Sequence, residues 1–302
     1  MNLGMVGLGR MGGNMAERLL QGGHKVVGYA HHADSVQRVV TLGGAGTTSL
    51  TDLVRQMAPP RIIWLMVPSG GPVDETITAL MPQVAAGDVI IDGGNSYYKD
   101  SMARGARLAE RGVHFIDVGT SGGIWGLREG YCLMIGGDRA VVQRLTPIFQ
   151  TLAPAPDRGW GYMGPLGAGH FVKMIHNGIE YGMMQAYAEG FALMQRKTAF
   201  DMNLAQIAEI WRHGSVVRSW LLDLTALALA QNPTLEGIAP YVQDSGEGRW
   251  TVVESLDLEV AIPVITQSLQ ERFKSRDANP FGDRLLAALR QQFGGHAVRS
   301  AQ

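Results

Sequence analysis

The chain opens with Leu3-Gly4-Met5-Val6, followed at once by Gly7-Leu8-Gly9-Arg10-Met11-Gly12. The first four residues suit a buried strand, and the glycines after them have the G-x-G-x-x-G spacing. Glycine at these positions permits a tight turn and lets backbone N–H groups at the start of a helix approach a pyrophosphate. The stretch therefore predicts a dinucleotide-binding strand–turn–helix unit. Its expected cofactor-binding residues are Gly7, Leu8, Gly9, Arg10, Met11 and Gly12.

The rest of the first half alternates short apolar runs with segments of helical spacing. Strands are expected at 3–6, 25–29, 62–67, 89–92, 115–118 and 132–135. Helices are expected at 12–21, 35–42, 73–81, 99–111 and 139–149. Such alternation is typical of a doubly wound, mainly parallel sheet, so residues 1–160 are predicted to form an α/β Rossmann-type domain that binds a dinucleotide.

The pattern changes after Pro154 and Pro156. The segment 151–165 is rich in Pro and Gly and is interpreted as a linker, and long helical stretches follow it. An all-α domain is therefore expected over 165–302. Its last helix is predicted to be capped by Asn279, to have Pro280 at its first position, and to end at Gly294-Gly295. The apolar stripe of that helix consists of Leu285, Leu286, Leu289 and Phe293.

Composition excludes several classes of protein. The 302 residues carry a net charge of −1, which argues against a broad surface for nucleic acid or anionic membranes. No signal peptide is recognisable, and no apolar run approaches the roughly 18 residues of a membrane span, so a cytoplasmic location is expected. Cys132 is the single cysteine, which rules out an internal disulfide; it is expected to be a buried small hydrophobe. No metal is expected.

The adenosine end of the predicted cofactor site lacks the usual carboxylate for the ribose 2′-OH. Ala30, His31 and His32 follow the second expected strand, with no acid to repel a 2′-phosphate and no dedicated arginine to bind it, although Arg10 or His31 could approach it. NAD, NADP and dual use all remain open at this point. Val67, Pro68 and Ser69 follow the third expected strand, at the carboxyl edge along which such a cofactor runs.

Two further loops are expected at the same edge of the sheet. They are Asp92-Gly93-Gly94-Asn95-Ser96 and Thr120-Ser121-Gly122-Gly123-Ile124-Trp125-Gly126. Backbone N–H groups and Ser or Asn side chains in such loops suit the carboxylate and hydroxyls of a sugar acid.

A third polar group lies on one helix. Within 167–181, the side chains of Lys173, His176, Asn177, Glu180 and Tyr181 fall in an arc of roughly 140°. Lys173 and Glu180 are about 10 Å apart along the helix axis, so a linear substrate of several carbons fits between an amine base and a carboxylic acid. We interpret this face as an active site rather than a solvated surface, because the remaining residues of the helix are largely apolar.

These motifs together closely resemble the 6-phosphogluconate dehydrogenase family, in its short-chain form. The most specific stretches are Ile91 to Ser96, Ser121-Gly122-Gly123, and His170 to Tyr181. The resemblance implies that Lys173 is the general base and Glu180 the general acid. It implies that Asn95 also nears the nicotinamide, that Tyr181 and Arg272 bind phosphate, and that Arg290 and His296 enter the site of a neighbouring subunit. The substrate-binding residues so implied are Asn95, Ser121, Gly122, Gly123, His176, Asn177, Tyr181, Arg272, Arg290 and His296.

The implied activity is oxidative decarboxylation of 6-phosphogluconate to ribulose 5-phosphate and CO2 with reduction of NAD(P)+, by a homodimer whose further pairing stays open. The resemblance also implies that the helical domain over 165–302 serves substrate binding and dimerisation. The helical domain is shorter than in the long form of the family. Ser245-Gly246-Glu247-Gly248-Arg249 also replaces the long form's phosphate-binding lysine and threonine. Two alternatives stay open for the phosphate: Arg249 compensates, or Arg272, Arg290 and Tyr181 carry most of the charge pairing. The alternatives are a non-decarboxylating β-hydroxyacid dehydrogenase, such as a 3-hydroxyisobutyrate dehydrogenase, and a dinucleotide-binding protein without turnover.

Overall fold

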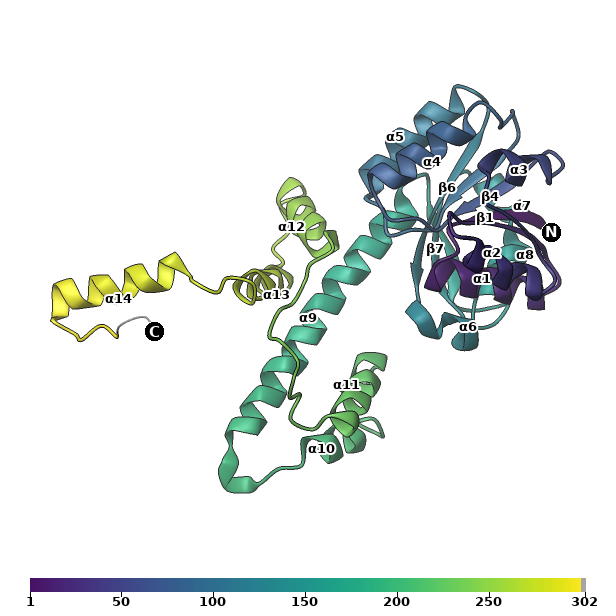
Figure 1. The fold of residues 1–302 in the computed structure, drawn as a ribbon. Helices are drawn as coiled ribbons and strands as arrows, with labels where there is room; N and C mark the ends of the chain where they lie inside the picture. The colour runs from purple at the N-terminus through teal and green to yellow at the C-terminus, as the bar shows by residue number, and fades with distance from the viewer. Residues whose placement is uncertain (300–302) are drawn as a thin grey trace. The chain divides into compact units, whose positions relative to one another are not determined.

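A computed structural model describes residues 1–299 of the chain (Figure 1). By its internal contacts the chain divides into two compact units, Met1–His176 and Asn177–Gln302. Among the described residues, no helix combines the length and apolar character needed to cross a membrane. The cytoplasmic location stays a prediction.

The first unit is built on one eight-stranded sheet with the order β3-β2-β1-β4-β5-β6-β7-β8. Neighbouring strands pair in parallel except β6 with β7, which are antiparallel. This is the predicted doubly wound, mainly parallel architecture. The strands are β1 (Asn2–Val6), β2 (Lys25–Tyr29), β3 (Ala45–Thr47), β4 (Ile62–Leu65), β5 (Val89–Asp92), β6 (His114–Ser121), β7 (Cys132–Gly136) and β8 (Trp160–Gly164).

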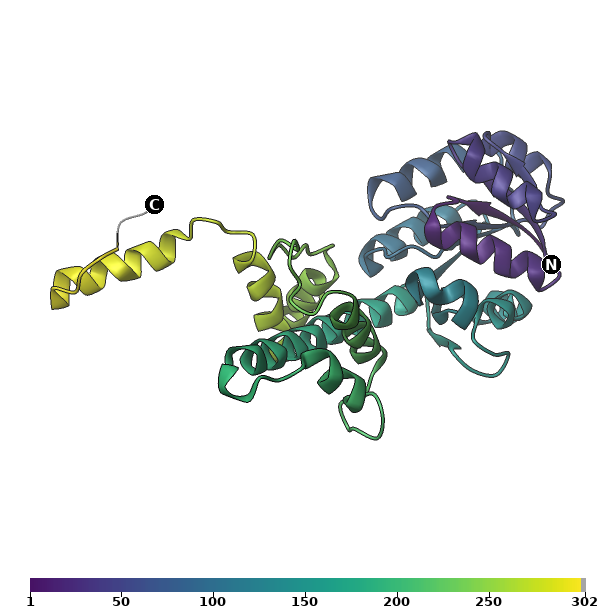
Figure 2. The same ribbon diagram turned by 60° about the horizontal axis from the view of Figure 1, so that its bottom comes forward.

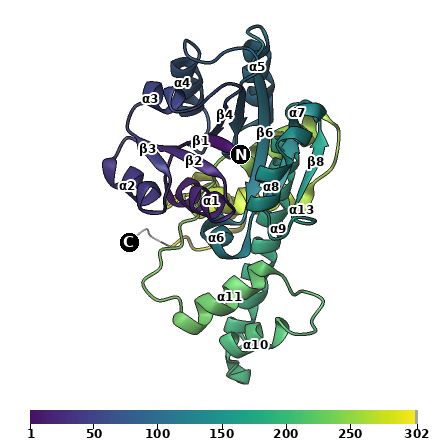
Figure 3. The same cartoon turned by 90° about the vertical axis from the view of Figure 1, so that its right-hand side faces the viewer.

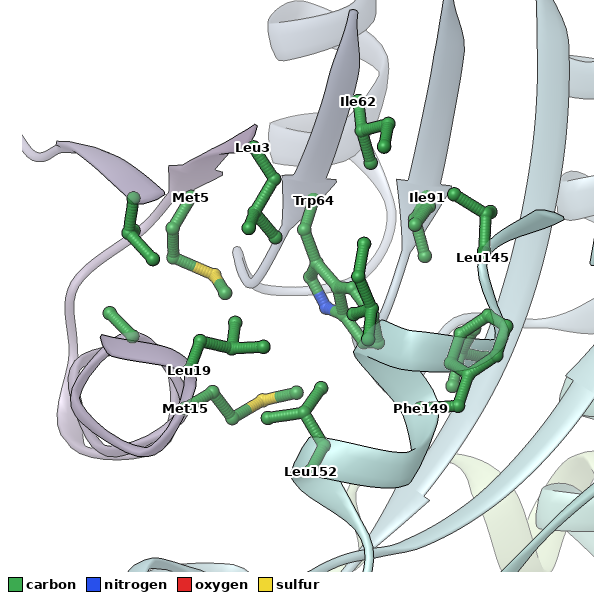
Figure 4. Packing of buried hydrophobic residues seen from close by; sticks show 14 of the residues in the cluster. Leu3, Met5, Met15, Leu19, Ile62, Trp64, Ile91, Leu145, Phe149 and Leu152 are labelled. Carbon is green, nitrogen blue, oxygen red and sulfur yellow. The ribbon is translucent and has the colours of Figure 1, made fainter. Parts of the chain in front are cut away.

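Helices cover both faces of this sheet. Side chains from α1, α7 and α8 pack in one apolar cluster, and those from α3, α4 and α5 in another, while successive β4 residues alternate between the two clusters. Figure 4 shows the first cluster, where Trp64 of β4 meets Phe149 of α8 with ring centroids 6.2 Å apart. The helices are α1 (Arg10–Gln21), α2 (Ala33–Thr41), α3 (Leu50–Arg55), α4 (Gly71–Leu80), α5 (Tyr98–Ala109), α6 (Gly126–Glu129), α7 (Arg139–Arg144) and α8 (Thr146–Leu152).

The structure corrects the expectation for 151–165. That segment is not a linker throughout, because Trp160–Gly164 forms β8 and pairs in parallel with β7, where it also contacts α7 (Figure 3). The helix expected over 139–149 is divided in two at Leu145, because α8 begins at Thr146 and has Pro147 in its first turn. The short elements β3 and α3 had no counterpart in the sequence-based prediction.

The second unit is helical over its described residues. The long helix α9 (Ala168–Arg196) begins in the first unit and runs on unbroken into the second, as Figures 1 and 2 show. The later helices are α10 (Leu204–Trp211), α11 (Trp220–Gln231), α12 (Glu247–Asp257), α13 (Pro263–Lys274) and α14 (Phe281–Gly294). The last helix starts one residue later than predicted, with Pro280 rather than Asn279 at the N-cap and no side-chain cap.

Candidate active site

The parallel strands bring the predicted cofactor and substrate loops of the first unit to one edge. Strands β1, β2, β4, β5 and β6 are mutually parallel, so the residues that follow each of them lie at the same carboxyl edge of the sheet. The loops after β1, β2 and β4 contain the predicted cofactor residues. Those after β5 and β6 contain Asn95 and the Ser121-Gly122-Gly123 turn.

The turn after β1 has the shape that a pyrophosphate requires. Gly7 has φ +94°, and a Cβ there would lie 2.4 Å from the Met66 carbonyl oxygen, while a Cβ on Gly12 would lie 1.9 Å from the Gly7 oxygen. Nothing lies within 4 Å of a Cβ built on Gly9, the N-cap of α1. That helix has neither a side-chain cap nor an acidic residue in its first turn, so its N-terminal N–H groups suit an anion. These residues fit a dinucleotide.

The adenosine end holds two exposed imidazoles. His32 is the N-cap of α2, and His31 lies next to it with Nδ1 3.4 Å from the Tyr29 hydroxyl. Ala30 is half-buried. Arg38, which was not among the predicted residues, lies within α2, and its Nη2 donates to Glu17 at 2.6 Å and to Asn14 at 2.8 Å.

A buried carboxylate shapes the loop of Asn95. Asp92 ends β5 fully buried and accepts hydrogen bonds from the Gly94 N–H at 3.1 Å and the Ser96 hydroxyl at 2.7 Å. The residues on either side of Asn95 are therefore held by the buried carboxylate, and the Asn95 side chain is exposed at the edge of the sheet.

The loop after β6 begins with two glycines at positive φ, Gly122 at +134° and Gly123 at +53°. Ser121 pairs across the antiparallel ladder with Cys132, the first residue of β7. Cys132 is exposed, so the prediction of a buried small hydrophobe is wrong: the residue lies at the end of its strand, not in the core. Partial desolvation raises the pKa of its thiol, and the nearby charge of Lys173 opposes that shift.

Lys173 is held against the sheet on the first turns of α9. Its side chain is 7% exposed, and its Nζ lies 3.3 Å from His176 Nδ1. A Cβ on Gly119 of β6 would lie 2.3 Å from the Lys173 Cβ, so only glycine at position 119 lets the helix approach this closely. Lys173 therefore lies two residues along the strand from Ser121, beside the predicted substrate loop.

A second buried carboxylate, which the sequence analysis missed, fixes the start of α9. Asp117 of β6 is fully buried and accepts the Gly167 N–H and the His170 N–H, each at 2.8 Å. A carboxylate at a helix N-terminus satisfies free N–H groups and complements the helix dipole. Asp117 thus sets the position of the helix that carries Lys173.

In the second unit, α9 carries Asn177, Glu180 and Tyr181, of which Asn177 and Tyr181 are buried and Glu180 is half-buried. The guanidinium of Arg272 on α13 lies 3.5 Å from the centroid of the Tyr181 ring, and its Nη1 donates to the Gln243 carbonyl at 2.8 Å. The Tyr181 hydroxyl is buried and has no hydrogen-bond partner among the described residues.

The segment that differs from the long form of the family is internally paired. Arg249 donates to Asp244 at 2.9 Å and stacks on Phe273, with its guanidinium 4.9 Å from the ring centroid. Asp244 is also 3.3 Å from Arg276; desolvation alone would raise the pKa of its carboxyl, but the arginines hold that pKa below its usual value. Ser245 donates to Glu247, which is buried at the start of α12.

Arg290 and His296 lie in the C-terminal part of the second unit. Arg290 is on α14 and His296 follows it, and both side chains are exposed. The apolar stripe of α14 is exposed as well, from 46% at Leu285 to 79% at Phe293.

Two sequence families cover most of the chain. Residues 2–164 match the NAD binding domain of 6-phosphogluconate dehydrogenase, and residues 169–287 match the 6-phosphogluconate dehydrogenase C-terminal domain. The chain belongs to the 6-phosphogluconate dehydrogenase family. The predicted family and fold class are confirmed. The prediction of an NAD(P)-binding oxidoreductase is confirmed with them.

Individual relatives agree with this placement. The NAD(+)-dependent, decarboxylating 6-phosphogluconate dehydrogenase of Haloferax volcanii is 42% identical over 99% of this chain and 98% of its own length. YqeC of Bacillus subtilis is 44% identical over 99% of both chains. The NAD(+)-dependent, decarboxylating enzyme of Bacillus subtilis is 37% identical, but this chain spans only 61% of it, as expected for the short-chain form.

Solved structures show the same fold. Plasmodium falciparum 6-phosphogluconate dehydrogenase superposes with a TM-score of 0.84 at 26% identity, covering all of this chain and 66% of that one. Mycobacterium tuberculosis 3-hydroxyisobutyrate dehydrogenase superposes with a TM-score of 0.73 at 19% identity, covering 96% and 99% of the two chains. The second likeness is one of fold alone.

Proposed function

We propose that this protein oxidises and decarboxylates 6-phosphogluconate to ribulose 5-phosphate and CO2, with NAD(P)+ as the hydride acceptor. The observation that carries the proposal is the placement of Lys173, a buried amine that lies beside the Ser121 loop at the carboxyl edge of a dinucleotide-binding sheet. An amine in that place can act on the hydroxyl of a substrate whose carbon faces a nicotinamide.

In the proposed reaction Lys173 takes the proton of the C3 hydroxyl while a hydride leaves C3, and a ketone forms. The bound nicotinamide supplies the acceptor for that hydride. The Lys173 ammonium then donates a proton to the C3 oxygen as the C1–C2 bond breaks and CO2 leaves. The electron pair of the broken bond becomes part of the C2–C3 double bond of an enediol. Glu180, two helical turns further along α9, protonates the carbon that carried the carboxylate, while Lys173 takes back the proton of the C3 oxygen, so that the ketone of ribulose 5-phosphate forms.

The remaining substrate contacts are proposed for the residues that the resemblance assigns. Asn95, Ser121, Gly122 and Gly123 bind the carboxylate end, and His176 and Asn177 bind the hydroxyls. Tyr181 and Arg272 bind the phosphate: Arg272 exchanges its bond to the Gln243 carbonyl for phosphate oxygens, and the buried Tyr181 hydroxyl gains a partner. Arg249 takes no part, because Asp244 already binds its guanidinium.

The cofactor assignments are proposed in the same way. Val67, Pro68 and Ser69 run along the nicotinamide half, and Ala30, His31 and His32 along the adenosine half, with NAD preferred over NADP. Arg38, the first arginine after β2, is bound to Glu17 and Asn14. The Haloferax volcanii relative is named as NAD(+)-dependent. Comparison of kcat/KM for the two cofactors tests the preference, and a higher value with NADP would contradict it.

The helical domain, 165–302, is proposed to form a homodimer in which α14 and the residues after it complete the partner's site. The exposure of its apolar stripe, together with that of Arg290 and His296, supports this arrangement. An exposed apolar stripe of this extent on a helix is usually covered by another protein surface.

Product analysis tests the reaction. The protein should release CO2 and NADH in equal amounts from 6-phosphogluconate and should turn over 3-hydroxyisobutyrate far more slowly. NADH without CO2 would instead favour the β-hydroxyacid dehydrogenase alternative.

Two variants test the roles. Lys173→Met should lower kcat by about 10²–10⁴-fold and leave NADH binding unchanged. Glu180→Gln should mainly slow tritium exchange at C1 of ribulose 5-phosphate; an unchanged exchange rate would remove Glu180 from the reaction.

A further inference from the structure

Arg104 is a buried cation with no role in the chemistry proposed above. It lies on α5 with its side chain 3% exposed. Its Nε and Nη2 donate to the two carboxylate oxygens of Asp74, both at 2.9 Å, and Nη2 also donates to the Gly70 carbonyl at 3.2 Å. Gly70 is the N-cap of α4 and Asp74 lies in its first turn. This side of the guanidinium therefore fixes the end of the Val67-Pro68-Ser69 loop.

The other side of the guanidinium faces the loop of Asn95. Nη1 is buried and has no hydrogen-bond partner among the described residues, and it lies 3.8 Å from Oδ2 of Asp92. Asp92 holds Gly94 and Ser96, the two residues that flank Asn95. One side chain thus lies between the proposed cofactor loop and the proposed substrate loop.

The gap between Nη1 and Asp92 is the informative feature. An unsatisfied buried donor costs free energy, and a hydrogen bond to a charged acceptor recovers it. A shift of less than 1 Å would close 3.8 Å to an ordinary hydrogen bond. If the Arg104–Asp74 pair served only to join α4 to α5, it would not need a buried charge, because well-packed apolar residues often stabilise such a contact equally well.

We propose that Arg104 is a positioning residue that couples cofactor binding to substrate binding, by closing its Nη1 onto Asp92 when both loops are occupied. This inference rests on the proposed function, which assigns the two loops to cofactor and substrate. Occupation of the loop at 67–70 moves Asp74 and, with it, the guanidinium of Arg104 toward Asp92. The guanidinium then holds Asp92 and, through it, the residues on either side of Asn95.

The coupling is measured as a ratio of dissociation constants. The Kd of 6-phosphogluconate is determined with and without saturating NADH, which gives a complex that cannot turn over. In the wild-type protein NADH should tighten 6-phosphogluconate binding by about 5-fold or more, within the usual range of coupled sites. In Arg104→Met that ratio should fall to about 1, because the link between the loops is gone.

Arg107→Met is the matched control. Arg107 is an exposed arginine on the same helix, three residues further along, and its charge also acts on Asp74. It should keep the wild-type ratio. An unchanged ratio in Arg104→Met, or a ratio of 1 in the wild-type protein, would overturn the proposal.

Two milder variants keep the test decisive if Arg104→Met does not fold. Arg104→Lys retains the charge but cannot grip Asp74 with two parallel bonds, and Asp74→Asn keeps the shape of the partner. Both should lower the ratio in a protein that still folds, and wild-type ratios in both would overturn the proposal. Turnover of 6-phosphogluconate by the wild-type protein is measured first: its absence counts against the proposed function, whereas turnover with an unaltered ratio counts against Arg104 alone.

Discussion

The two units of the chain bury very different material. The first unit buries apolar side chains on both faces of its sheet and also encloses the polar groups Asp88, Asp92, Asp117 and Arg104. Among the residues that the structure describes, the apolar cluster of the second unit has five buried members, with partly buried side chains packed against them; the buried members are Phe191, Ala208, Leu222, Ala226 and Leu229. Large apolar side chains are exposed along α14 instead. The comparison indicates that the first unit has a sufficient core of its own, whereas the second leaves large apolar side chains exposed, as the proposed homodimer requires.

Two phenylalanines give the largest contrast. Phe149 is fully buried against Trp64 and Trp160, so Phe149→Ala should cost about 3–5 kcal/mol of unfolding free energy. Phe293 on α14 is 79% exposed, so Phe293→Ala should leave the unfolding free energy of dilute protein nearly unchanged and weaken self-association. Urea denaturation and sedimentation at several concentrations measure both effects. Equal destabilisation by the two variants would remove the distinction between the units.

The second prediction concerns the proposed contribution of α14 to a partner's site. Arg290→Met should raise the KM for 6-phosphogluconate by about 10–100-fold, because a charge-assisted bond to phosphate contributes roughly 1.5–3 kcal/mol. Mixing inactive Lys173→Met chains with Arg290→Met chains should restore turnover at low substrate. Mixed dimers would then hold one site with both an intact lysine and an intact arginine. Failure of such mixtures to gain activity, with mixed dimers shown to form, would contradict the contribution in trans.

Within the second unit, a smaller difference is expected between two arginines. Arg272→Met should raise the KM for 6-phosphogluconate by about 10-fold, as the loss of one partly exposed phosphate contact does. Arg249→Met should change that KM little, because Arg249 is engaged by Asp244 and Phe273. Steady-state kinetics decide between them, and a larger effect from Arg249 would reassign the phosphate contact.

The extent of sequence-based prediction also differs between regions. The inner strands were found because strands buried on both faces are continuous apolar runs, as at Val89–Asp92. Strand β3 has three partly exposed residues, and β8 follows a Pro- and Gly-rich stretch, so neither has a recognisable period.

The loops of the candidate site were likewise predictable, because each directly follows a strand and contains a recognisable motif. The groups that support them were not. Asp117 meets its partners 50 and 53 residues away, and Arg104 meets Asp74 at a separation of 30 residues. Such pairs depend on the order of strands in the sheet, which local periodicity does not specify.

The smallest expected effect lies in the first unit and depends on pH. His24 is buried, with Nε2 2.8 Å from the Thr151 hydroxyl and Nδ1 3.2 Å from the N-terminal ammonium. Burial and that ammonium lower the pKa of His24 below its ordinary value of 6.5. The native state therefore binds the proton less readily than the unfolded state, so stability is complete above pH 6.5 and falls as the pH drops from 6.5 through the lowered pKa.

His24→Gln should abolish the loss of stability below pH 6.5. A substitution of the exposed His32, His32→Gln, should leave that loss in place. Melting temperatures at pH 8, 6.5 and 5 compare the two variants with the wild-type protein. If the difference between His24→Gln and wild type were the same at all three pH values, His24 would not be the group that makes the first unit sensitive to acid, because a lowered pKa requires the difference to change below 6.5.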